Sequence, residues 1–290
     1  MARVLVTGAH GQLGMELGIE LLTQGFEVIK ADHELLDITN EFEVKSVIAD
    51  LKPDAIINAA AYTAVDLAET EEEKAYAVNA LGSKYLALAS KNLDIPLIHV
   101  STDYVFSKVT GASHTEDEET FCEGVYAQTK LDGENLIQEN CSKYLIVRTS
   151  WVFGRFGRNF VKAIFNKAKT TDTLCVVADE LGNPTPARGL AVGLVRMLKD
   201  CLQDGFDKYG LYHFSGQPAL NRYEFALEII KIASELKLLD HEAKVQAIKK
   251  ADLNLKAKRP DDSRLNCDKV VKTFNLELPL WRDYIEETIC

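Results

Sequence analysis

The chain has 290 residues, 47% of them hydrophobic, so it can bury a full core in one large domain or two unequal ones. Its formal net charge of −11 argues against nonspecific binding to nucleic acid or to a membrane surface. No apolar run approaches the roughly 18 residues of a membrane span, and the N-terminus lacks the anatomy of a signal peptide. We therefore expect a cytoplasmic protein.

The six cysteines are scattered, without a CxxC pair or a metal-ligand spacing, and the six histidines do not cluster with them. This usage favours free thiols in a reducing compartment over disulfides. We expect no metal site.

The first half of the chain alternates short apolar runs with helical stretches. Strands are predicted at 3–7, 27–31, 55–60, 96–101 and 144–150, and helices near 12–24, 41–51, 71–92 and 125–140. Nearly continuous apolar strands are typical of a parallel sheet covered on both faces, and their alternation with helices indicates βαβ units. We predict an α/β fold in which residues 1–150 form a doubly wound, Rossmann-type domain that binds a dinucleotide.

After about residue 151 the alternation loosens. Amphipathic helices are predicted at 159–169, 190–202 and 223–236, with shorter strands at 174–177 and 211–214 between them. This pattern indicates a smaller, mainly C-terminal α/β lobe over residues 151–290, which we expect to bind substrate. Some of its segments are expected to return to the first domain.

The segment TGAHGQLG places Gly8, Gly11 and Gly14 directly after the first strand and at the start of a helix. Glycines allow a sharp turn and a close approach to a pyrophosphate, and the helix N-terminus supplies free N–H groups. Asp32, just past the second strand, is either a ligand of the cofactor ribose or a residue that caps a turn. As a ribose ligand, it would favour NAD over NADP.

The segment STDYVF places Thr102 and Asp103 at the carboxyl end of the fourth strand, where open α/β sheets bind ligands. Tyr126 and Lys130 lie four residues apart on a predicted helix, a spacing that alone is also typical of a simple helix-face contact. Together with the glycine motif, the set favours an active site. A nearby ammonium and a nicotinamide cation would lower the pKa of the Tyr126 phenol, which would then donate a proton to a carbonyl oxygen.

Six segments in order along the chain resemble the dTDP-4-dehydrorhamnose reductases, a family of extended short-chain dehydrogenases/reductases. They are TGAHGQLG, NAAAYTAVDLAE (58–69), STDYVF (101–106), YAQTKLDGE (126–134), RTSWVFG (148–154) and RPDDSRLN (259–266). The resemblance implies reduction of the 4-keto group of dTDP-4-dehydro-L-rhamnose to dTDP-L-rhamnose with NADPH or NADH. It implies a dTDP-linked nucleotide sugar as substrate and allows a homodimer.

The resemblance also implies roles for individual residues. The catalytic residues would be Thr102, Tyr126 and Lys130. The cofactor would contact Gly8, Gly11, Gln12, Leu13, Gly14, Asp32, Asp37, Ile38, Ala61, Tyr62, Thr63, Tyr126 and Lys130. The nucleotide sugar would contact Val65, Thr102, Asp103, Tyr104 and Trp151, although Val65 and Trp151 also suit a packing role. Candidates for the substrate diphosphate are Arg148, Arg155, Arg158, Arg259 and Arg264.

The sequence departs from the family pattern at several places. Ala127 follows Tyr126 without the usual glycine, no proline precedes it, and 217–225 lacks the usual Ser-Trp-Tyr. Some family members hold Mg²⁺ with glutamates, and Glu16 could correspond to one, but 184–191 contains no acid. We therefore predict no metal there.

Two other functions remain open. A related 4-epimerase or dehydratase would share the fold, although Tyr104 stands where a dehydratase commonly has a glutamate. A non-catalytic subunit similar to the regulatory β-subunit of methionine adenosyltransferase would keep the fold without the chemistry.

Overall fold

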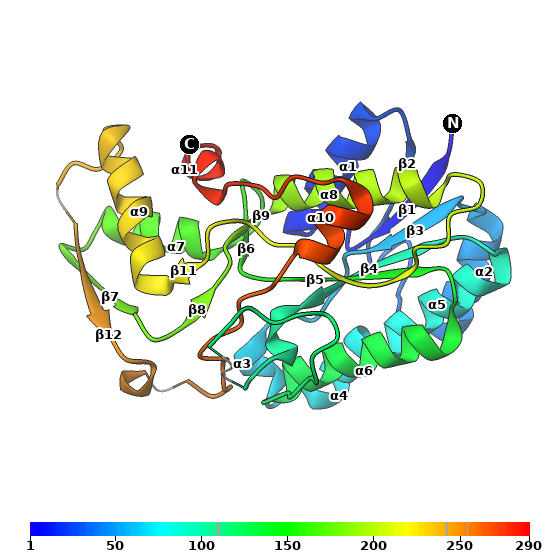
Figure 1. The fold of residues 1–290 in the computed structure, drawn as a ribbon, viewed down its shortest axis with the longest axis horizontal. Coiled ribbons are helices and arrows are strands. Elements are labelled where there is room, and N and C mark those ends of the chain that lie inside the picture. Colours follow the sequence, from blue (N-terminus) through cyan, green and yellow to red (C-terminus); the bar gives the residue numbers. More distant parts are fainter. Residues whose placement is uncertain (109–110, 242, 254) are drawn as a thin grey trace.

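A parallel sheet forms the centre of the computed structural model, which describes residues 1–108, 111–241, 243–253 and 255–290 (Figure 1). Within the described residues the sheet has six strands in the order β10-β5-β4-β3-β1-β2, and all neighbours pair in parallel. The strands are β1 (Arg3–Thr7), β2 (Glu27–Ala31), β3 (Ala55–Asn58), β4 (Leu97–Thr102), β5 (Tyr144–Thr149) and β10 (Gly210–His213). The predicted doubly wound parallel fold is confirmed.

Helices cover both faces of this sheet. One face carries α1 (Gln12–Thr23), α8 (Ala187–Cys201) and α10 (Asp268–Phe274). The other carries α2 (Glu41–Leu51), α5 (Gly82–Leu93) and α6 (Val125–Asn140). The predicted helix near 71–92 is a continuous run of α4 (Glu72–Tyr76), the π-helix η1 (Ala77–Leu81) and α5. The strand predicted at 211–214 belongs to the central sheet as β10, beside β5.

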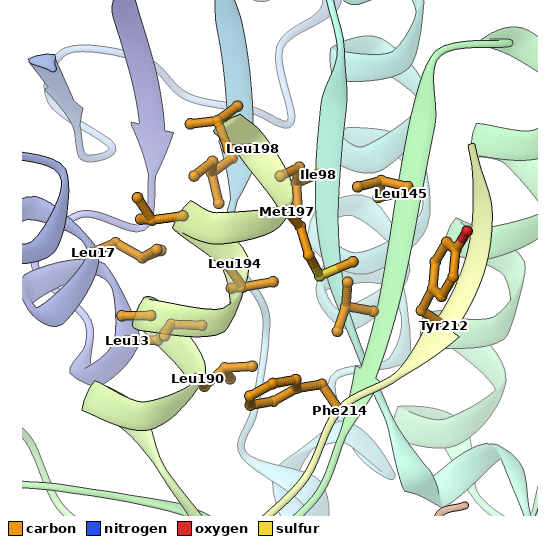
Figure 2. Close-up of a cluster of buried hydrophobic side chains, with 14 of the residues drawn as sticks. Leu13, Leu17, Ile98, Leu145, Leu190, Leu194, Met197, Leu198, Tyr212 and Phe214 are labelled. Carbon is orange, nitrogen blue, oxygen red and sulfur yellow. The ribbon is translucent and has the colours of Figure 1, made fainter. Parts of the chain in front are cut away.

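The largest core cluster lies between the sheet and the α1/α8 layer, and Figure 2 shows part of it. Leucines of α1 meet leucines of α8 above apolar side chains of β4, β5 and β10, and all of them are buried. The labelled residues are Leu13, Leu17, Ile98, Leu145, Leu190, Leu194, Met197, Leu198, Tyr212 and Phe214. The second half of the chain therefore supplies a strand and two helices to the core of the first.

The smaller lobe has its own apolar core. It contains α7 (Phe160–Ala168), α9 (Arg222–Glu235) and α11 (Ile285–Ile289), packed with the parallel pair β7 (Thr173–Val177) and β12 (Lys244–Ile248). Phe225 and Trp281 lie at its centre, with ring centroids 5.2 Å apart. Short strands join the two regions: β6 (Val152–Phe153) pairs with β9 (Thr185–Pro186), and β8 (Leu181–Gly182) with β11 (Leu220–Asn221).

The remaining short elements lie in connections. They are α3 (Val65–Ala68), η2 (Asp103–Val105), η3 (Lys250–Asp252) and η4 (Trp281–Tyr284). All six cysteines are free thiols, as their spacing predicted. Among the residues that the structure describes, no helix has the length and apolarity needed to cross a bilayer.

The strand order fixes where a ligand can enter. The chain passes from β1 to β2 on one side and then crosses to β3 on the other side of β1. Because the loops after β1 and β3 leave the sheet in different directions, a crevice opens at their carboxyl ends. Both the glycine segment and the 59–64 loop begin at this point.

Candidate active site

The glycine turn after β1 brings three chain segments unusually close together. Gly8 has φ +64°, and a Cβ there would lie 2.7 Å from the backbone nitrogen of Ala60. A Cβ on Gly14 would lie 2.2 Å from the carbonyl oxygen of Gly8. These two glycines therefore hold the turn against both the β3 loop and the first turn of α1, as a dinucleotide-binding turn requires.

A cavity of about 340 Å³ opens beside this turn, at the carboxyl ends of β1 and β3. Its volume falls within the range of ligand pockets. Six of the predicted cofactor residues line it: Gly8, Gly11, Asp32, Asp37, Ile38 and Ala61. The glycine backbone and the mixed polar and apolar lining fit the adenosine end of a nicotinamide dinucleotide.

Other predicted cofactor residues lie next to the cavity. The Gln12 side chain donates to the Val152 carbonyl and accepts from Asn159, while the Leu13 side chain is buried in the core. Gln12, Leu13 and Gly14 can therefore offer a pyrophosphate their backbone N–H groups at the start of α1. Tyr62 and Thr63 follow Ala61 along the same loop.

Asp32 caps the turn after β2. Its carboxylate accepts the backbone N–H groups of Glu34 and Leu35, each at 3.1 Å, and pairs with His10 at 3.0 Å. The Leu35 hydrogen bond is the main cause that lowers the pKa of Asp32. The capping role is thus seen directly, and the same side chain also borders the cavity where a ribose would lie.

The end of β4 and the start of α6 bring Thr102, Tyr104 and Tyr126 together. The Thr102 hydroxyl donates to Asp103 Oδ1 at 3.2 Å, and the Tyr104 and Tyr126 rings meet edge to face with centroids 5.5 Å apart. Burial raises the pKa of Tyr126, and the nearby Thr102 side chain opposes this only in part. In the protein without cofactor, desolvation of the phenolate outweighs the other contributions, and the lowering expected from Lys130 together with a nicotinamide cation stays a prediction.

Lys130 lies one helical turn beyond Tyr126 and is 1% exposed. Its Nζ donates to the Val100 carbonyl at 2.8 Å and lies 3.2 Å from His99 Nε2. Burial lowers the pKa of Lys130 to about 8, although the Glu134 carboxylate acts in the opposite direction. The lysine is thus held against β4, with its head group directly beneath the predicted site.

In the segment before Tyr126, which departs from the family pattern, α6 begins after a glycine and beside a carboxylate from another segment. Gly124 has φ +91°, and the Glu69 carboxylate accepts the backbone N–H of Val125 at 2.8 Å. A negative charge at this end of the helix is favourable, because the first N–H groups lack partners within the helix. Further along α6, buried Glu134 binds Arg148 at 2.6 Å and Ser101 at 2.5 Å.

Asn79, in the π-helix η1, is a site residue that the sequence analysis missed. Its side chain accepts from Tyr62 N at 2.8 Å, and it donates to Tyr62 O at 3.2 Å and Thr129 Oγ1 at 3.1 Å. One buried amide therefore ties the cofactor loop to the catalytic helix. The available signal was weak: a single asparagine within an otherwise apolar stretch of helix.

A second group of predicted residues faces the smaller lobe. Asp103 accepts from Ser263 Oγ at 2.5 Å, and burial raises its pKa to about 6. The Trp151 ring lies under the guanidinium of Arg222, 3.5 Å from the ring centroid, and Arg222 reaches Glu180 at 3.8 Å. Arg222 was not predicted, although its position falls within the segment that departs from the family pattern.

Most of the candidate diphosphate arginines are already paired. The ion pairs are Arg148 with Glu134, Arg155 with Glu16, Arg259 with Asp66, and Arg264 with Asp262. Arg148 is buried and bound by Glu134, and its Nη1 has no hydrogen-bond partner among the described residues. Among the described residues, no group of three His, Cys, Asp or Glu side chains is placed to hold a metal. Val65 is half-buried at the start of α3.

Replacing Asn79 with leucine should loosen the link between the cofactor loop and α6. The Tyr62 N–H and C=O and the Thr129 hydroxyl would lose a buried partner, at a cost of about 1–3 kcal/mol in unfolding free energy. We expect weaker NADPH binding as well, measured by fluorescence titration beside urea unfolding. The matched control is Asn92→Leu on the exposed side of α5, which should change neither. Equal NADPH affinity in both variants would contradict the link.

Replacing Asp103 with asparagine should stabilise the protein in a pH-dependent way. The folded carboxyl has a pKa of about 6, above the unfolded value of roughly 4, so wild-type stability falls as pH rises through this window. The amide of the variant does not ionise, so the free energy of unfolding of the variant does not fall in this window. Urea unfolding should show no advantage for the variant below pH 4 and an advantage approaching about 3 kcal/mol above pH 7. An advantage that does not vary with pH would contradict the raised pKa.

Comparisons with known proteins agree with this geometry. A family model described as the RmlD substrate binding domain matches residues 2–290. The dTDP-4-dehydrorhamnose reductase of Aggregatibacter actinomycetemcomitans is 42% identical over 283 residues, covering 97% of this chain and 96% of that protein.

Two solved structures share the fold over nearly the whole chain. The dTDP-4-dehydrorhamnose reductase of Bacillus anthracis in complex with NADP is 35% identical, with a TM-score of 0.90, covering 98% of this chain and 97% of that one. The orthologue from Clostridium acetobutylicum is 36% identical, with a TM-score of 0.91 and coverage of 99% and 98%. The chain belongs to the dTDP-4-dehydrorhamnose reductase family of NAD(P)-dependent oxidoreductases.

Proposed function

We propose that this protein reduces the 4-keto group of dTDP-4-dehydro-L-rhamnose to give dTDP-L-rhamnose. The observation that carries the proposal is the meeting of Thr102 and Tyr126 at the carboxyl end of β4, in the same sheet whose strands β1 and β3 end at the cavity. A relative with 42% identity and a solved relative with bound NADP support the substrate class and the cofactor. A bound NADPH or NADH would supply the hydride.

Tyr126 is the proton donor in this proposal. Its phenol is buried and its pKa is raised, so it carries its proton at neutral pH and can give it to the oxygen of the substrate carbonyl. Thr102, whose side chain lies near the same phenol, can donate its hydroxyl proton to that oxygen in turn. The Tyr104 ring lies edge to face with Tyr126 and supports the position of its ring.

The nucleotide sugar would lie on the side of Thr102 that faces the smaller lobe. Asp103, Tyr104 and Trp151 border this side, together with Arg222 from the start of α9. Arg222 covers one face of the Trp151 indole, and Gly182 packs directly against the same ring. Trp151 therefore offers the sugar its edge, while the Arg222 guanidinium is the nearest cation for the diphosphate.

A 4-epimerase remains the second candidate because its fold and its Tyr-Lys pair would be the same. An epimerase returns the hydride to its sugar, so its cofactor is not consumed. Dehydration needs a further acid, and the residue after Asp103 is Tyr104, whose pKa burial raises to about 12.

Replacing Tyr126 with phenylalanine should slow turnover by roughly 10²- to 10⁴-fold, because it removes the proton donor but keeps the ring and its packing. NADPH absorbance with dTDP-4-dehydro-L-rhamnose measures the rate, and NADPH titration checks that the cofactor still binds. The matched control is Tyr209→Phe, whose ring packs against Phe206 in the sheet core. A Tyr126→Phe enzyme as fast as the control would contradict the assignment.

A further inference from the structure

The cofactor cavity carries an ion pair where the glycine turn meets the end of β2. His10, between Gly8 and Gly11, places its Nδ1 atom 3.0 Å from Oδ2 of Asp32, and both side chains line the cavity. A carboxylate can only accept hydrogen bonds, so Nδ1 carries the proton of this contact. The His10 side chain is 67% exposed, so a ligand in the cavity can reach its other nitrogen, Nε2.

Both carboxylate oxygens of Asp32 are already engaged by the protein. Oδ1 accepts the backbone N–H groups of Glu34 and Leu35, each at 3.1 Å, and Oδ2 accepts from His10. An acidic residue at the end of the second strand ordinarily binds the ribose hydroxyls of NAD and disfavours the 2′-phosphate of NADP. Here the turn and His10 use hydrogen-bonding capacity that a ribose would need, and a protonated His10 offsets the charge of the carboxylate.

The other ionisable groups in the cavity lining lie on the segment after β2. His33 follows Asp32 in the chain and also acts electrostatically on its carboxylate. The Asp37 carboxylate accepts the backbone N–H and the hydroxyl of Thr39, at 2.9 and 2.7 Å. Among the described residues the lining thus contains two carboxylates and two imidazoles. Protonation of one imidazole halves the formal negative charge that an entering anion would meet.

We propose that His10 selects the cofactor by binding the 2′-phosphate of NADPH, with Asp32 as the residue that orients its ring. With Nδ1 donating to Asp32, the protonated ring presents Nε2–H to the cavity. A hydrogen bond from a charged donor to a phosphate oxygen is among the stronger polar contacts in proteins. NADH has an uncharged hydroxyl at this position and gains less from an imidazolium. His10 therefore favours NADPH, whereas Asp32 alone would favour NADH.

This arrangement couples NADPH binding to the uptake of a proton. A neutral His10 has its one proton on Nδ1, so its Nε2 could offer the phosphate only a lone pair. The negative charge of the phosphate favours the protonated ring. The phosphate itself is almost fully ionised at pH 7.5, because its second pKa is about 6. NADPH should therefore bind with uptake of a proton by the protein at this pH, and NADH should not.

Calorimetric titration of the purified protein with NADPH and with NADH tests the proposal. We expect the wild type to bind NADPH more tightly than NADH. Binding needs no keto sugar. Although the proposal rests on the proposed function for the use of NADPH, an error in the substrate assignment would therefore leave these affinities unchanged.

His10→Asn keeps an amide nitrogen near the place of Nδ1, for the contact with Asp32, but removes the Nε2 donor and the charge. NADPH binding should weaken about 10-fold, at the low end for a charged hydrogen bond because the site is exposed, and NADH binding should change less than about twofold. The matched control is His33→Asn in the same lining, which should leave the ratio of the two affinities near that of the wild type.

His10→Arg separates charge from a structural role of the turn. A guanidinium is permanently charged, so this variant should keep the preference for NADPH but bind it without proton uptake. Proton uptake is measured as the change in binding enthalpy between Tris and HEPES buffers at pH 7.5, which differ in ionisation enthalpy. The wild type should show uptake with NADPH only, and His10→Asn should show none.

Asp32→Asn should shift the preference in the opposite direction to His10→Asn. The amide oxygen can still accept the N–H groups of Glu34 and Leu35, while the negative charge near the phosphate is gone, so NADPH should gain affinity relative to NADH. Equal weakening of both cofactors in His10→Asn would show a structural role and overturn the proposal. A wild type that binds NADH more tightly, or NADPH binding without proton uptake, would also overturn it.

Discussion

Helix α6 carries polar and charged side chains into a buried interface, and each of them needs a partner because an unpaired buried group costs about 1–3 kcal/mol. Thr129 pairs with Asn79, Lys130 with His99 and Val100, and Glu134 with Arg148. These contacts fix the rotation and height of the helix against β4 and β5. Tyr126, at its first turn, is thereby fixed beside Thr102. The position of the proton donor thus depends on pairing along the whole helix.

The same contacts couple the two halves of the site. Asn79 holds the loop after β3 as well as α6, and Asn58 begins that loop while it orients His99. The predicted cofactor and catalytic residues are therefore joined by one set of buried hydrogen bonds at the carboxyl ends of β3 and β4. Networks of this kind hold a specific geometry when every member is satisfied. A change at the loop is expected to reach Tyr126 through this layer.

The sequence alone predicted the fold because its strongest patterns are local. Buried parallel strands are continuous apolar runs, so their positions could be found within a residue or two along the first half. The sequence did not show that β10 lies at the edge of the central sheet, because a short run such as 210–213 has the same pattern in a strand of either lobe. Its pairing with β5 is set by contacts about 65 residues away in sequence.

Within the site, the strand-end rule placed Thr102 and the Tyr-Lys spacing pointed to Tyr126, but the partners of these residues were not predictable. Asn79, His99 and Glu69 belong to no recognisable sequence motif, and their roles depend on the atoms that they contact in the fold. His99 contacts Lys130, 31 residues away in sequence, and Glu69 contacts Val125, 56 residues away. Arg222 stands at a departure from the family pattern, yet only the fold shows that it covers Trp151. The raised pKa of Tyr126 likewise follows from burial that no local pattern reveals.

A site that reduces a keto sugar must consume its cofactor, whereas an epimerase recycles it. The stoichiometry of the wild-type reaction separates the two: moles of NADPH oxidised per mole of dTDP-4-dehydro-L-rhamnose converted, followed by absorbance and by chromatography of the sugar nucleotide. We expect one equivalent of NADPH for each dTDP-L-rhamnose formed. Conversion of the sugar with no net loss of NADPH, or bound NADPH that is never oxidised, would contradict it.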